Sequence, residues 1–115
     1  MKNKLLRLAE IIQQDFSEDL VEVFRSTANQ SLAMKIELVG EARTAHQRRS
    51  EALWLQAGKK RTLAEKRATA QADLAAFVIA YLTGDGKEYL ETAVEALEVL
   101  GRHGEVDLVT SLANR

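Results

Sequence analysis

The 115-residue chain contains no cysteine and no proline, and six of its residues are phenylalanine, tyrosine or tryptophan. Without cysteine the chain has no disulfide framework, no thiolate zinc site, no iron–sulfur cluster and no cysteine nucleophile. The missing proline removes the strongest helix breaker. Alanine, with 17 residues, and leucine, with 16, dominate the apolar content, and both favour helices. The composition therefore predicts an all-α protein.

The sequence also lacks long apolar runs. No stretch approaches the roughly 18 uninterrupted apolar residues that a membrane-spanning helix needs. Near the N-terminus, Arg7 and Glu10 interrupt the apolar residues, so this stretch has no signal-peptide core. We therefore expect a cytoplasmic protein with no membrane contact. A composition of 46% hydrophobic and 29% charged residues is typical of one folded domain, which we place over residues 1–115.

Apolar residues at three- and four-residue spacing predict the first three helices. One is expected at about residues 2–14, and the next begins at Ser17, whose hydroxyl is a candidate N-cap. Residues 29–31 are small and polar, so they either end this second helix or lie inside a longer one, and both alternatives stay open. Only Gly40 interrupts Leu32 to Ala57, which predicts a helix of about 25 residues, or about 38 Å.

Glycine-containing segments separate the remaining helices. Gly58 begins a turn, after which Thr62 and Glu65 have the spacing of a capping box and start a helix that should end near Thr83. Asp85 and Glu88 repeat that spacing. The predicted fold is an all-α, four- or five-helix bundle. It is built around a long antiparallel helical hairpin at about residues 31–83, with short C-terminal helices at about residues 87–113.

Neither sign of charge dominates the chain, which has 16 basic and 17 acidic residues. The two signs are nevertheless separated along it. Residues 1–42 carry a net charge of −2, residues 43–67 of +6 and residues 68–115 of −5. Because residues 43–67 lie on both sides of the turn at Gly58, we expect the positive charge at the closed end of the hairpin.

Four consecutive apolar residues, Ala52 to Leu55, cover every side of the long helix near this end. Leu55 shares a face with Glu41 and Arg48 that is otherwise typical of solvent exposure. Two interpretations stay open: Trp54 is buried against the N-terminal helix or a second copy of the chain, or it anchors a different protein. The inner face of the same helix is expected to hold small residues and one arginine, namely Leu38, Ala42, Ala45, Arg49, Ala52 and Leu53.

The sequence offers little for catalysis. Its two histidines, His46 and His103, lie in the basic segment and in a predicted inter-helix turn, away from any recognisable nucleophile motif. No Glu-x-x-His pair suitable for a helical di-iron site is present. Gly58-Lys59 resembles the end of a phosphate-binding loop, but Leu53 occupies the position of the upstream glycine. We therefore expect no enzymatic activity, no cofactor and no metal ligands.

The basic segment is the strongest candidate for a functional surface. We predict a non-enzymatic helical protein–protein interaction module, a small adaptor, inhibitor or regulator that acts as a homodimer and contacts an acidic protein surface. The alternative is a nucleic-acid-binding regulator that contacts phosphates. Six phosphate contacts would cost about a thousandfold in affinity between 50 and 200 mM salt. The predicted partner-binding residues are Arg48, Arg49, Trp54, Leu55, Lys59, Lys60, Arg61, Lys66 and Arg67.

Overall fold

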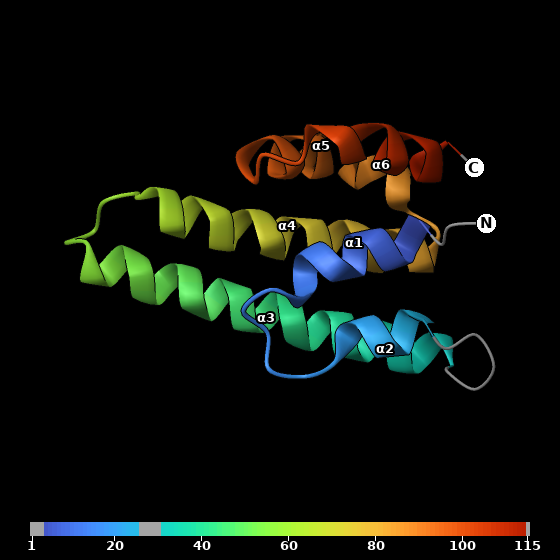
Figure 1. The fold of residues 1–115 in the computed structure, drawn as a ribbon, viewed down its shortest axis with the longest axis horizontal. Coiled ribbons are helices and arrows are strands. Elements are labelled where there is room, and N and C mark those ends of the chain that lie inside the picture. The colour runs from blue at the N-terminus through green and yellow to red at the C-terminus, as the bar shows by residue number, and fades with distance from the viewer. Residues whose placement is uncertain (1–3, 26–30, 115) are drawn as a thin grey trace.

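The computed structural model describes residues 4–25 and 31–114, and it confirms an all-α bundle built around a long helical hairpin (Figure 1). The described residues hold six α-helices, against the four or five predicted, and none of these helices is both long and apolar enough to cross a membrane. The helices are α1 (Lys4–Gln13), α2 (Leu20–Arg25), α3 (Leu32–Gln56), α4 (Leu63–Thr83), α5 (Leu90–Val99) and α6 (Val106–Ala113), with short 3-10 helices at Gly86–Tyr89 and His103–Glu105.

Two separate helices, α2 and α3, lie within residues 17–57, which resolves the alternative that the sequence left open. Ser31 has an extended backbone, and its hydroxyl accepts a hydrogen bond from the Met34 N–H, so α3 begins there with an N-cap. Residues 29 and 30 lie outside the described residues. The predicted cap of α2 was wrong: the Asp19 carboxylate, rather than Ser17, accepts the Glu22 N–H at 3.0 Å.

The hairpin turn follows from glycine at the end of α3. Gly58 and Lys59 both have positive φ angles, of 69° and 66°. Their N–H groups donate to the carbonyls of Leu55 and Trp54, which ends the helix in a Schellman turn. Thr62 then caps α4 by accepting the Glu65 N–H, as predicted.

The α4–α5 connection departs from its predicted cap. Gly84, with φ of 97°, ends α4 in a second turn of the Schellman type. Asp85 makes no side-chain cap hydrogen bond, and a 3-10 turn leads into α5 instead of the capping box expected at Asp85 and Glu88.

All six helices contribute to one hydrophobic core, in which α4 packs against α3, α5 and α1. All eleven residues from Ala70 to Ala80 of α4 are buried or half-buried because neighbouring helices surround this part of the helix. The largest fully buried apolar side chains are Phe77, Leu8, Ile12, Leu20, Leu74, Leu97, Val39, Val78 and Val109.

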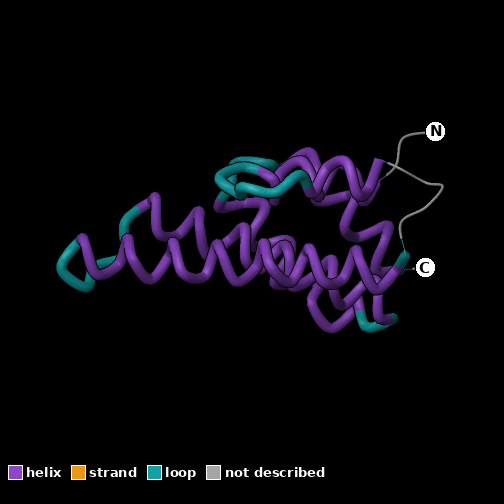
Figure 2. Tube along the Cα trace, turned by 90° about the horizontal axis from the view of Figure 1, so that it is seen from below, coloured by secondary structure: helices purple, strands orange, loops and turns teal. Residues whose placement is uncertain are grey.

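The closed end of the hairpin extends beyond every other helix, and both views show this overhang (Figures 1 and 2). The molecule is accordingly elongated, at 45 × 26 × 22 Å. Along α3 the buried residues are Val39, Ala42 and His46, and none after His46 is fully buried. We call residues 47–67 the hairpin end.

The inner face of α3 was predicted in part: Ala42 is fully buried and Leu38 packs against the core, but the centre of the face lies elsewhere. Ala52 is exposed and Ala45 is half-buried, whereas Val39 and His46 are fully buried. The true face is rotated from the predicted face by roughly 60°. The physical reason is that His46, a polar residue, is held inside by a hydrogen bond to α1, and counting small apolar residues does not detect such a contact.

Candidate functional site

All nine predicted partner-binding residues lie in the hairpin end, but the structure does not bring them onto one face. Trp54 and Leu55 are 37% and 54% exposed. Successive residues on a helix point about 100° apart, so these two side chains cover adjacent sides of α3. The expectation that Trp54 is buried against the N-terminal helix was wrong, because α1 packs nearer the open end of the hairpin (Figure 1).

Arg49, one of the predicted partner-binding residues, makes several contacts within the fold. Its guanidinium donates to the Asp15 carboxylate at 2.9 Å and to His46 Nδ1 at 3.2 Å. It also donates to the side-chain oxygen of Gln71. These contacts join α3 and α4 to the turn that follows α1, so the Arg49 guanidinium is engaged within the molecule.

The same network completes the hydrogen bonding of α1. The last carbonyls of a helix have no partner within it. Here His46 Nε2 donates to the Ile12 carbonyl at 2.8 Å, and Gln71 Nε2 donates to the carbonyls of Ile11 and Gln14 at 3.1 and 2.9 Å. Burial, reinforced by the Arg49 charge, lowers the pKa of His46 below its usual 6.5. The ring is therefore neutral, with Nδ1 as an acceptor.

A second polar cluster, centred on Glu65, holds α3 and α4 together in the hairpin end. Arg61 Nε donates to Glu65 Oε1 at 2.6 Å, while the hydroxyls of Ser50 and Thr69 donate to Oε2 at 2.8 and 2.5 Å. Arg61 lowers the pKa of Glu65 to about 2, with help from Thr69 and Ser50. Arg61 is thus engaged within the hairpin. The capping-box spacing identified the Glu65 position but not this set of partners.

Five predicted cations form no ion pair within the described residues: Arg48, Lys59, Lys60, Lys66 and Arg67 are exposed and unpaired. Arg48 lines a shallow depression on α3 together with Glu37 and Glu41. The other four surround the turn and the first turns of α4. The hairpin end therefore presents positive charge on several sides.

Leu63 is an exposed apolar residue of the hairpin end that the sequence argument did not select as a binding residue. It is 58% exposed at the first position of α4. Lys66 and Arg67 follow it by three and four residues, so they flank it on one helix face. The available signal was its helical spacing with Ala70 and Leu74, which places it on the apolar side of α4.

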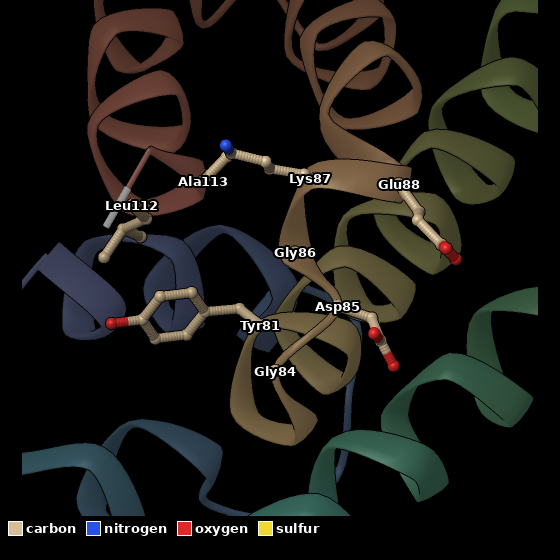
Figure 3. Close-up of a pocket in the computed structure, with 8 residues that line it drawn as sticks. All are labelled: Tyr81, Gly84, Asp85, Gly86, Lys87, Glu88, Leu112 and Ala113. Atoms are coloured by element: carbon tan, nitrogen blue, oxygen red, sulfur yellow. The ribbon is translucent and has the colours of Figure 1, made fainter.

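Several cavities lie outside the core. One of about 320 Å³ is lined by Trp54, Arg61 and Glu65 among others. At the opposite end, a cavity of about 420 Å³ lies between α4 and α6, where the Tyr81 ring points toward Leu112 and the Lys87 side chain extends toward Ala113 (Figure 3). Among the described residues, no group of three or more His, Asp or Glu side chains is placed to hold a metal ion.

Comparison with family models, with curated proteins and with solved structures finds no match to this chain.

Proposed function

We propose that this protein is a non-enzymatic interaction module that binds a partner protein through the hairpin end, as a small adaptor, inhibitor or regulator would. The observation that supports the proposal is the exposure of Trp54, Leu55 and Leu63 on a projecting element. Exposed tryptophan and leucine side chains at one end of a monomer are typical of contact surfaces. The unpaired cations around them favour a partner surface that is acidic.

A nucleic acid is the alternative partner. The cations of the hairpin end could contact phosphates. Against this, Arg49 and Arg61 are engaged in internal contacts, which leaves five free cations spread over several sides of the hairpin. Leucine side chains, two of which are exposed here, contribute nothing to phosphate contacts, and a single tryptophan gives little surface for base stacking. We therefore favour the protein partner.

Site-specific photocrosslinking tests the proposal. The photoreactive residue p-benzoylphenylalanine replaces Leu55 in the full-length chain, which is expressed in its native cells and irradiated. The matched control carries the same residue in place of Asp107, which is exposed on α6. We expect light-dependent, protease-sensitive adducts at position 55 that are absent at position 107. Changing Lys59, Lys60 and Arg67 to glutamate should reduce the yield.

Two results would overturn the proposal. One is the absence of protein adducts at position 55 beyond those at position 107. The other is adducts that nuclease removes and protease does not, which would establish the nucleic-acid alternative. Titration of labelled duplex DNA and RNA at about 50 mM and 200 mM salt checks the second result independently, because phosphate contacts are strongly salt-dependent.

A further inference from the structure

An apolar face of α4 continues past the helix that covers it. Leu63, Ala70, Leu74 and Phe77 follow one another at helical spacing, so they lie on one side of α4. Ala70, Leu74 and Phe77 are buried, and Ala70 lines a cavity with Ala96 and Val99 of α5. Because the layer formed by α5 and α6 stops short of the hairpin end (Figure 1), Leu63 is left uncovered.

The uncovered part of this face is basic. Lys66 and Arg67 flank Leu63, and Lys59 and Lys60 lie in the adjoining turn. None of these four cations forms an ion pair within the described residues. Two hairpin ends placed against each other would bring like charges together at an unfavourable cost. Charge complementarity therefore favours an acidic helix as the element that covers Leu63.

The protein itself carries such a helix. On α5, Glu91, Glu95 and Glu98 recur at four- and three-residue spacing and are all exposed. They lie on the side of α5 opposite the buried Ala93, Ala96 and Leu97. Glu95 also borders the cavity that Lys66 and Asp73 of α4 line. None of the three forms an ion pair in the described part of the chain. This acidic stripe is unpartnered and extends along a helix of about 15 Å.

We propose that two copies of the chain form a two-fold symmetric dimer in which the hairpin end of each copy lies on the acidic stripe of α5 in the other. The hairpin end and the layer of α5 and α6 form a step in each molecule (Figures 1 and 2). Packed helices lie about 8–10 Å apart, so a step of one helix layer accommodates the α5 layer of a second copy. Within one molecule Glu95 lines the same cavity as Lys66, whereas Leu63 does not line it and stays 58% exposed.

Symmetry makes each contact occur twice. Leu63 and Val99 would supply apolar contact near the two-fold axis. Val99 is 40% exposed in the single chain. Lys66 and Arg67 would lie against the glutamates of the partner's α5. The interface is small and highly charged, so we expect reversible association that weakens with salt. The inference rests on the proposed function, since it names a second copy as the partner of the hairpin end.

Charge reversal with rescue provides the test, using the purified full-length chain and sedimentation velocity at about 50 mM and 500 mM salt. The wild type should dimerise at low salt and dissociate at high salt. Lys66→Glu with Arg67→Glu should raise the dimer dissociation constant at least about tenfold, and so should Glu91→Lys with Glu98→Lys. Combining all four changes in one chain should restore the dimer, because both interfaces are then complementary again.

Matched controls separate the proposed contact from general charge effects. Glu10→Lys changes an exposed acid on α1 that lies outside the proposed interface, and it should leave dimerisation intact. Leu63→Ser removes the apolar contact without charge change and should weaken the dimer. Leu63→Ser also tests the contact if a charge-reversed chain fails to fold, which circular dichroism would reveal.

A monomer at concentrations up to about 200 µM in low salt would overturn this inference. So would a dimer that the paired reversals do not weaken, or one that the fourfold variant does not restore. These outcomes are distinct from failure of the proposed function. A monomeric chain that still forms protein adducts at position 55 retains an interaction surface for a different protein, whereas a chain without such adducts does not.

Discussion

Replacing Glu65 with glutamine should destabilise the fold in a pH-dependent manner. The carboxylate receives hydrogen bonds from Arg61, Ser50 and Thr69, although it is almost fully buried. Glutamine retains the shape but removes the charge and one of the two acceptor oxygens. The cluster therefore loses the Arg61 ion pair and at least one well-placed hydroxyl contact.

The size of the effect follows from the pKa of Glu65, which is about 2 in the folded protein against its ordinary 4.5. That difference corresponds to an upper limit of about 3.4 kcal/mol at neutral pH. The Arg61 side chain is 58% exposed, and solvent screening weakens an ion pair of this kind. We therefore expect Glu65→Gln to lower the free energy of unfolding by about 2 kcal/mol.

Urea denaturation followed by circular dichroism measures this change. With an m value of about 1.5 kcal/mol/M, the midpoint should fall by about 1.3 M at pH 7. Because the folded pKa is depressed, the stabilisation is complete above about pH 4.5 and is lost as the pH falls through about 2. The difference between wild type and variant should shrink over that range.

Glu51→Gln is the matched control, since Glu51 is an exposed acid of the same hairpin end and forms no ion pair in the described residues. This variant should change the free energy of unfolding by less than about 0.5 kcal/mol. An unchanged midpoint for Glu65→Gln at pH 7, or a difference that stays constant down to pH 2, would refute the reasoning.

Two further changes test the turn and the buried network. Gly84→Ala should lower the free energy of unfolding by about 1–2 kcal/mol, because a left-handed backbone with φ of 97° strains any residue with a Cβ. Gly104→Ala is the control, since a Cβ there meets open space and φ is not positive. It should lower the free energy of unfolding far less in the same urea denaturation experiment. His46→Leu should cost about 1–3 kcal/mol at pH 7 by removing the donor to the Ile12 carbonyl. Since the folded pKa of His46 is lowered, the wild type should lose stability as the pH falls below 6.5. That part of the pH profile should be absent from the variant, and an identical profile in both proteins would contradict the assignment.

Local signals in the sequence predicted the hairpin well. Proline is absent between Leu32 and Thr83, Gly58 begins a turn with backbone bonds within five residues, and Thr62 caps α4 through a group three residues away. Each of these depends on neighbours along the chain. The apolar spacing likewise predicted the extent of α3 and α4, because amphipathic faces repeat with the helical period.

The roles of the polar residues could not be predicted in the same way. Arg49 was assigned to a partner surface because it lies among other cations, yet its acceptor Asp15 is 34 residues away. The sequence did not indicate the roles of Gln71 and His46, because both bind backbone carbonyls of α1, and every residue type has the same carbonyl group. A charge count places positive residues at the hairpin end, but only three-dimensional contacts separate the engaged cations from the free ones.

The way in which α1 ends also constrains the order of folding. Its final carbonyls obtain their donors from α3 and α4, and Gln71 lies 60 residues after Ile11. A short isolated helix is marginal in water. During synthesis, which proceeds from the N-terminus, the last carbonyls of this helix are left to water until the hairpin has formed. We therefore expect the N-terminal segment to dock late, onto a formed hairpin that Asp15 also contacts through Arg49.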